Sequence, residues 1–565
     1  MKRSYFLAVA LNAVGSAQLV LAQSSPDAGA ILRQIEGAKG PALSVPATEP
    51  QGARVAPQAD GSGQRTRIDR FVFVGNTKLG DAALAQAISG FTGKDLSLAQ
   101  IREAAAVIAN VYRQAGWVAA VIVPEQDVTE GNCRLEILES VAADIHVRSA
   151  DGLKAQVPDA LLIGLASNAL PKGEIISTQA LDRAILLAGD IPGVHVEGVL
   201  TPGEIDKSST LELQTTVKPS WSGQLSADNE GSRSTGADRL QAGLSYANPA
   251  GIGDLAGLSM METEGINYLR ASYGFPLGYS GLRGSASLSD MNYKLVGSDF
   301  SALGASGTAQ TLGLELAYPI LRGRQSNVNA SFATELRRFE NDGAAAVTSK
   351  YAMQSNSLSV SASSLQNITS LPGVWSASAG FVWGDVDLGG SPNQAQDAAG
   401  PASAGAFSKL RWSLSRQQTL PNSFSLEVSL SGQSASKNLD SSEKMQLGGS
   451  DGIRAYPTGE ASGNDGVMAR IDMTRPLGGG FAGGVFYDWG SVRQTHTAYS
   501  GMPAPDEVDL QGAGVTLQWS GDRGQGASLT YSKRIGSNPL AQANGSDQDG
   551  SLVSDRVWLA VHFQF

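Results

Sequence analysis

The chain has 565 residues, a formal net charge of −11 and a mean hydropathy of −0.10. An acidic balance of this size argues against a general nucleic-acid-binding surface, which is usually basic. The one cysteine, Cys133, excludes an internal disulfide framework and a metal site built from several cysteines. We interpret Cys133 as a small buried residue of a strand rather than as a catalytic thiol.

Residues 1–22 have the pattern of a signal peptide. Lys2 and Arg3 give a basic start, residues 5–14 are mostly apolar, and the predicted cleavage precedes Gln23. Beyond this segment no run approaches the roughly 18 apolar residues of a membrane-spanning helix. The chain is therefore expected to be exported, and any membrane domain in it would be built from strands.

A short helix is predicted in the segment 23–40. Asp27 can cap its N-terminus, and Ile31, Leu32 and Ile35 fall on one apolar stripe. Residues 41–65 are rich in Pro, Gly, Ala and Ser and lack the apolar residues of a core. We interpret this second segment as a linker.

Two small α/β units are predicted next, over residues 66–143 and 144–218. In the first, the apolar run 71–74 indicates a strand, and residues 98–112 carry an apolar stripe at helical spacing. In the second, a helical pattern near 178–187 precedes strand patterns at 195–200 and 210–217. The shared order of strand, two helices and two strands indicates a repeat of architecture.

From Trp221 to Phe565 the sequence consists of short alternating segments separated by turns. In the last segment Val557, Leu559, Val561, Phe563 and Phe565 share one face. A single alternating strand also suits a soluble sandwich, but a long series of them suits a barrel with lipid outside and a polar lumen inside. The length favours sixteen antiparallel strands, and residues 512–514 suggest a β-bulge.

Motifs for catalysis or cofactors are weak. Residues 448–452 fit the G-x-S-x-G pattern of a hydrolase, with Ser450 as the nucleophile, but they lie in a Gly-rich loop without the required strand and helix. No paired-cysteine or two-histidine metal motif and no phosphate-binding loop is present in the sequence. We therefore expect no enzyme activity, no metal and no cofactor.

In this order, the segments resemble the TpsB transporters of two-partner secretion, also called haemolysin secretion/activation proteins. The resemblance covers the mature chain and implies a plug helix, two polypeptide-transport-associated (POTRA) domains and a sixteen-stranded outer-membrane barrel. Residues 26–33 resemble the start of the plug helix. The residues that match POTRA motifs are Gly75, Asn76, Tyr112, Gly116, Pro124, Gln126, Pro192 and Gly193.

The most specific local match is Gly452-Ile453-Arg454-Ala455-Tyr456, which resembles a family motif at the tip of a loop that folds into the barrel. The family pairs this arginine with a strand aspartate, which the resemblance places at Asp488. An arginine confined in a lumen needs a carboxylate, so the pair would fix the loop. Ala455 stands where glycine is usual, and it would be strained if the tip required a positive φ.

The resemblance implies a transporter in the outer membrane of a Gram-negative bacterium, which secretes a large partner exoprotein of the adhesin or haemolysin class and could also activate it. It also implies that Phe563 and Phe565 belong to the signal by which the barrel assembly machinery inserts such proteins. An assembly factor for other barrels is the main alternative. A passive porin and an outer-membrane hydrolase are further ones.

Overall fold

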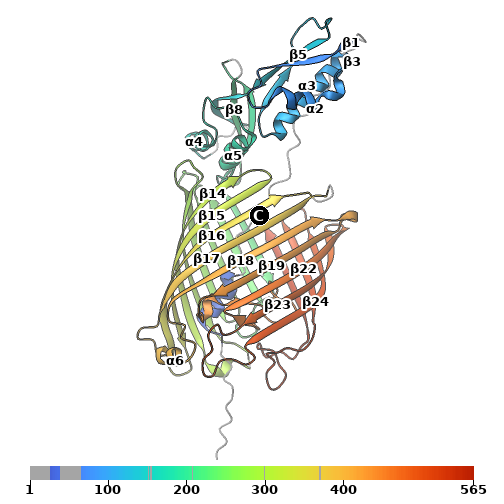
Figure 1. The fold of residues 1–565 in the computed structure, drawn as a ribbon. Coiled ribbons are helices and arrows are strands. Elements are labelled where there is room, and N and C mark those ends of the chain that lie inside the picture. Colours follow the sequence, from blue (N-terminus) through green and yellow to red (C-terminus); the bar gives the residue numbers. More distant parts are fainter. Residues whose placement is uncertain are drawn as a thin grey trace, which may run out of the picture.

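A computed structural model of the chain shows a barrel with two small α/β domains at one end and a short helix in its lumen (Figure 1). The predicted signal peptide lies outside the described residues, as does the predicted linker apart from Arg65. No helix among the described residues is long and apolar enough to cross a membrane. The structure describes residues 26–37, 65–150, 152, 156–205, 208–297, 299–367 and 371–565.

The barrel is closed by sixteen antiparallel strands, as predicted, because the last strand pairs with the first. Each strand otherwise pairs with its neighbours in the sequence. Two short strands, β20 (Met445–Gln446) and β21 (Ser462–Gly463), pair only with each other, inside the long connection between β19 and β22. The barrel strands are β9 (Trp221–Asp228), β10 (Arg239–Ala247), β11 (Leu255–Glu262), β12 (Ile266–Pro276), β13 (Arg283–Lys294), β14 (Ser306–Arg322), β15 (Ser326–Asp342), β16 (Val347–Leu365), β17 (Gly373–Asp387), β18 (Gly405–Thr419), β19 (Ser425–Ala435), β22 (Asp465–Gly478), β23 (Phe481–Arg493), β24 (Glu507–Ser520), β25 (Gln525–Arg534) and β26 (Asp555–Gln564).

The alternation along the strands separates an apolar outer face from the lumen. In β26 the predicted outward set from Val557 to Phe563 is exposed, whereas Trp558 between them is buried. The predicted bulge at residues 512–514 is wrong, because β24 keeps an unbroken register with both neighbours. Its glycines instead make room for lumen side chains: a Cβ on Gly512 would meet Ala455, and one on Gly514 would meet the ring of Phe486.

The first α/β domain contains the predicted strands and helix. Helix α3 (Leu98–Gln114) begins at a capping box, in which the Ser97 hydroxyl accepts from the Gln100 amide and the Gln100 side chain accepts from the Ser97 amide. The helices α2 (Asp81–Ala87) and α3 cover a sheet in the order β2-β5-β4. The strands are β1 (Arg65–Ile68), β2 (Arg70–Val74), β3 (Lys94–Ser97), β4 (Ala119–Ile122) and β5 (Asn132–Glu139).

The second α/β domain has the same plan. Its sheet has the order β6-β8-β7, and its two helices bury an aliphatic core against it. This core consists mostly of Leu, Ile, Val and Ala. The elements are β6 (Val141–Ser149), α4 (Asp159–Ala169), α5 (Thr178–Gly189), β7 (Val194–Pro202) and β8 (Ser208–Val217).

Ion pairs attach the second domain to the near rim of the barrel, where Figure 1 shows α4 and α5 next to the strand ends. Arg322 at the end of β14 makes two hydrogen bonds, of 2.7 and 2.9 Å, to the Asp190 carboxylate. Arg183 of α5 donates to the carbonyl oxygens of Pro319 and Ser280 at 2.8 and 3.2 Å. Charge-assisted contacts of this kind fix orientation as well as distance.

Glycines let the two surfaces approach closely at the same rim. A Cβ on Gly164 of α4 would lie 2.4 Å from the ring of Tyr279, which belongs to the turn between β12 and β13. A Cβ on Gly253, in the turn between β10 and β11, would lie 2.7 Å from Leu161. Real Cβ atoms are not found so near another atom, so the second domain and these turns have complementary surfaces.

A buried carboxylate, Glu139 at the end of β5, ties the first domain together. It accepts hydrogen bonds from the backbone amides of Thr77 and Lys78, both at 2.7 Å, and from the hydroxyls of Thr77 and Tyr112. Burial by itself would raise the pKa of Glu139, but these hydrogen bonds outweigh it and lower the pKa. The same carboxylate and burial raise the pKa of Tyr112.

This network makes the stability of the first domain depend on pH. Because the pKa of Glu139 is lower in the folded state, its contribution is complete above the ordinary value of about 4.3 and is lost as the pH falls through the folded-state value. We expect Glu139→Gln to speed proteolysis within residues 65–139 at neutral pH. We also expect its cleavage rate to change less than that of the native chain between about pH 6 and pH 3.

The matched control is Glu103→Gln, on the exposed face of α3. It should leave both the cleavage rate and its pH dependence unchanged. An equal pH dependence in the native and Glu139→Gln chains would contradict the prediction.

Candidate functional site

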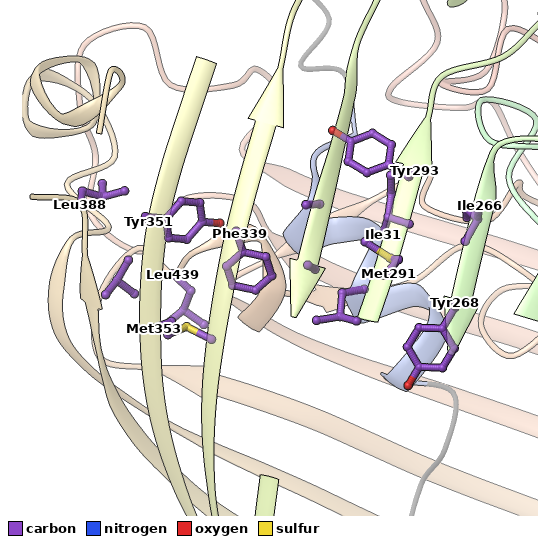
Figure 2. Close-up of a cluster of buried hydrophobic side chains, with 14 of the residues drawn as sticks. Ile31, Ile266, Tyr268, Met291, Tyr293, Phe339, Tyr351, Met353, Leu388 and Leu439 are labelled. Carbon is purple, nitrogen blue, oxygen red and sulfur yellow. The ribbon is translucent and has the colours of Figure 1, made fainter. Parts of the chain in front are cut away.

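The helix α1 (Ala28–Gly37) lies inside the barrel. The Asp27 carboxylate accepts from the Ala30 amide at 2.8 Å, as an N-cap does, and from the Ser441 hydroxyl at 2.7 Å. Ile31 and Leu32 are buried, and Ile35 packs at the edge of the same cluster. Figure 2 shows Ile31 beside Met291 of β13, so the predicted apolar stripe faces the barrel wall.

The other end of α1 is held by polar contacts. The Glu36 carboxylate accepts hydrogen bonds from the Tyr268 hydroxyl at 2.8 Å, from Ser289 at 3.2 Å and from Arg270 at 3.3 Å. A cavity of about 340 Å³ lies beside this end and is lined largely by charged side chains. The helix thus occupies part of the lumen and leaves this cavity beside it unfilled.

The connection 436–464, between β19 and β22, packs against α1 within the barrel. Its short helix η4 (Ser441–Glu443) packs on α1, where a Cβ on Gly29 would lie 2.6 Å from the Ser441 hydroxyl oxygen, and Gln446 donates to the Ala30 carbonyl at 3.3 Å. The wall holds η4 through charge: Glu443 pairs with Lys409 at 2.5 Å and with Arg337 at 2.7 Å. These ion pairs are almost completely buried, so their geometry must be well matched to offset desolvation.

Further along this connection, Arg454 lies between two strand carboxylates. Its guanidinium donates to Asp488 of β23 at 2.6 and 2.9 Å and to Asp472 of β22 at 2.7 and 3.2 Å. It also lies over the ring of Phe486, 3.5 Å from the centroid. Asp488 is fully buried, and its second cationic neighbour is Arg470 at 3.7 Å.

The residues beside Arg454 are equally enclosed. The Arg454 carbonyl accepts hydrogen bonds from the Ser532 hydroxyl at 2.6 Å and from the Trp558 indole N–H at 2.7 Å. Tyr456 is fully buried, with the Arg534 guanidinium over its ring at 4.5 Å. The tripeptide 454–456 therefore contacts the lumen face of strands in the stretch of wall from β22 to β26.

Ala455 is not strained. The non-glycine residues with a positive φ in the described chain are Asn248, Ala402, Asn422 and Ser423, so the tip does not require glycine at this position. Ala455 is fully buried, and its methyl group faces Gly512 of β24, where an added Cβ would lie only 2.5 Å away. The space for the loop tip is therefore provided by a glycine of the barrel wall, Gly512, and not by a glycine of the loop.

The other predicted site residues lie in three separate places. In the first domain, Gly75 has a φ of 92° under the Ile137 carbonyl, and the Asn76 side chain caps the following turn through Leu79 and Asp81. Gln126, next to Pro124, exchanges hydrogen bonds with the Arg134 backbone.

Two glycines of the same set lie at junctions between domains. Gly116 has a φ of 86°, and its carbonyl accepts from the Thr178 amide of the second domain at 2.9 Å. Gly193, after Pro192, has a φ of 84° and faces Ala247 of β10. Phe563 and Phe565 stack on each other on the outer face of the barrel.

The hydrolase alternative gains no geometric support. Ser450 lines a cavity together with Glu230 and Arg239, and no histidine of the described chain lines that cavity. Of the two histidines that follow Ser450, His496 bonds Asp465 at 2.9 Å, and His562 lies in β26, where it is paired with Ser226. The described residues contain no group of three His, Cys, Asp or Glu side chains that could hold a metal ion.

Sequence reasoning missed four contacts of Arg454, those with Asp472, Phe486, Trp558 and Ser532. The alternation of β22 predicts that Asp472 faces the lumen, but only the pairing of β22 with β23 brings it beside Asp488. Phe486 belongs to the same short motif as Asp488 and could have been assigned from its spacing of two, which puts both on one face. Trp558 had no signal beyond being a bulky residue on the inner face of β26.

The close contact of α1 with η4 predicts the effect of adding bulk there. Gly29→Val should push α1 away from Ser441 and Ser442, and the ionic current through the barrel in planar bilayers should rise. The control is Gly37→Ala, because the nearest neighbour of that position is the flexible Arg33 side chain. Equal conductance of the Gly29→Val and native proteins would contradict the prediction.

The contact of Ala455 with Gly512 predicts a rescue. Gly512→Ala should destabilise the docked loop by about 1–3 kcal/mol through overpacking and expose residues 448–460 to protease. Adding Ala455→Gly removes the opposing methyl group and should restore protection. Failure of the double variant to recover would show that this pair does not position the loop.

The matches to known proteins agree with this arrangement. Residues 207–518 match the family model for haemolysin secretion/activation protein ShlB/FhaC/HecB, and residues 66–140 match that for the ShlB-type POTRA domain. The heme/hemopexin transporter protein HuxB of Haemophilus influenzae is 26% identical over 92% of this chain and 93% of its own. Outer membrane transporter CdiB of Dickeya dadantii is 25% identical over 70% of each chain.

Among solved structures, CdiB from Escherichia coli matches with a TM-score of 0.64 at 18% identity, covering 91% of this chain and 93% of its own. This likeness supports the fold, and the family model spans more than half of the chain. The chain therefore belongs to the haemolysin secretion/activation family, the TpsB transporters of two-partner secretion, and it is an outer-membrane transporter of a Gram-negative bacterium and not an enzyme.

Proposed function

We propose that the two α/β domains capture the partner exoprotein in the periplasm and that the barrel passes it outward in extended form once α1 has left the lumen. The family implies a secreted partner. Its identity is our proposal: a large exoprotein of the adhesin or haemolysin class. The name of HuxB adds a protein that acts on haem or hemopexin as a candidate.

The observation that carries the proposal is that, within the described residues, helix α1 is held in the lumen without any backbone–backbone hydrogen bond to a barrel strand. Its contacts are the apolar stripe, the ends at Asp27 and Glu36, and single hydrogen bonds to the side chains of Asn341 and Gln446. Residues 38–64 join it to the first domain and would keep it tethered after release. A permanent structural element would gain nothing from such an arrangement, whereas a removable plug needs it.

The periplasmic domains offer sheet edges to an unfolded chain. β2 and β4 are the outer strands of the first sheet, and β6 and β7 are those of the second. Val72 and Val74 are exposed along β2, and Val199 along β7. Strand addition at such an edge binds an extended chain mainly through its backbone, which suits a client that is not yet folded.

Three further parts complete this proposal, of which the first two rest on the resemblance to the family. The domain bounds are 66–143 and 144–218 for the POTRA domains and 221–565 for the barrel. Phe563 and Phe565 contribute to recognition by the barrel assembly machinery. Folding of the client outside the cell drives transport, because the sequence has no nucleotide-binding motif.

The test is deletion of the gene in its own bacterium, followed by mass spectrometry of the medium and of the outer membrane. We expect one large exoprotein to disappear from the medium, and the native chain but not a chain lacking residues 68–217 to restore it. Barrel proteins of the outer membrane should keep their levels. General loss of those proteins, with the medium unchanged, would favour the assembly factor over the transporter.

A further inference from the structure

The barrel closes through an unusually short ladder. β9 and β26 pair over five residue pairs, from Ala560↔Asp228 to Gln564↔Gln224, whereas every other ladder of the barrel has eight or more. We call this ladder the seam. It holds the periplasmic half of β26, so the half of β26 nearer the extracellular end has no strand beside it on the β9 side.

Backbone hydrogen bonds continue the seam by one residue at each end. At the periplasmic end Gly223 and Phe565 exchange two of them, and at the other end the Asn229 amide donates to the Leu559 carbonyl at 3.2 Å. The Asn229 carboxamide also accepts from the Leu559 amide at 2.8 Å and donates to the Val557 carbonyl at 3.0 Å. After Asn229 the chain turns away toward β10.

The loop at residues 448–460 bridges the two sides of the seam from inside the barrel. On one side of the seam, the Arg454 carbonyl accepts from Trp558 of β26 at 2.7 Å. On the other side, the Thr458 hydroxyl donates to the Glu230 carbonyl, in the connection between β9 and β10, at 2.9 Å. The Glu230 carboxylate pairs with Arg239 of β10 at 2.8 Å, and Ser450 of the loop lines the same cavity as these two residues.

We propose that this loop is a clamp across the seam, with Trp558 and Glu230 as its two wall contacts, in addition to being an obstruction in the lumen. The clamp is rigid because the Arg454 guanidinium is fixed to β22 and β23 through Asp472 and Asp488. The Arg454 carbonyl is thereby held where the Trp558 indole meets it. Undocking the loop removes the bridge between β26 and the β9–β10 connection.

The consequence is that opening the lumen and loosening the wall are one event. A loop that leaves its site gives a passing client the volume it occupied, and it also leaves the seam held only by its five pairs, the Gly223–Phe565 bonds and Asn229. The proposal concerns the protein without any client. It can therefore fail while the transport function stands, and the reverse also holds.

Hydrogen–deuterium exchange of the full chain in lipid nanodiscs tests the clamp. The variant combines Trp558→Phe, which removes the indole donor, with Thr458→Val, which removes the hydroxyl donor at nearly constant shape. We expect amides of β9 and β26 at the seam to exchange about tenfold faster, because two hydrogen bonds that stabilise it are lost. The β14–β15 ladder should not change, and it reports that the barrel is intact.

The control variant combines Trp519→Phe in β24 with Thr530→Val in β25, whose hydroxyl bonds Thr516. It should exchange like the native chain. A further variant adds Ser226→Cys and His562→Cys, which face each other across the seam, and oxidation of this pair should restore slow exchange to the clamp variant. Unchanged seam exchange in the clamp variant, or equal acceleration in the control, would overturn the proposal.

Discussion

A charged side chain sealed away from water must find an opposite charge, and this constraint organises the lumen. Arg454 meets it with two carboxylates, one fully buried and one partly so, and with the face of Phe486. Removing one partner of such a group typically costs about 3–5 kcal/mol because the other charge is left uncompensated. The loop thus has one position in which Arg454 and Asp488 are both satisfied, and its neighbours are built around that position.

The two obstructions in the lumen belong to one stretch of chain. The connection 436–464 touches α1 through η4 near its start and grips the wall through Arg454 further on. β20, which precedes Arg454, pairs with β21, which follows it, and this pairing closes the stretch into a compact unit. In the proposed release of α1, a shift of η4 would reach the Arg454 site through this short stretch of chain.

The architecture was largely predictable, because alternation with a period of two survives any choice of register. The outer face of β26 and the order of the α/β elements follow from such local patterns, and the strand number follows from the length of the segment and the family resemblance. Contacts across strands were not predictable in the same way. Asp472 meets Arg454 because of the register of β22 against β23, and Trp558 meets the Arg454 carbonyl because of the closure of the barrel.

The glycines opposite the loop tip show the limit of structure prediction from local sequence patterns. Residues 512–514 suggested a bulge, and Ala455 suggested strain. Both features are explained by one packing contact, in which the glycine lies in the wall at Gly512 and the methyl group lies in the loop at Ala455. A glycine in a strand can be needed for its backbone conformation or for the space that a side chain would occupy. The sequence is the same in either case. Only the residue opposite, known from the structure, distinguishes the two.

The close fit between the second domain and the barrel rim bears on how members of this family can recombine. Gly164 accepts Tyr279, Gly253 accepts Leu161, and Asp190 accepts Arg322, so each half of the fit is encoded in a different domain. A second domain transplanted alone would meet turns shaped for another partner. The smallest interchangeable module is this domain together with the turns after β10 and β12 and the end of β14.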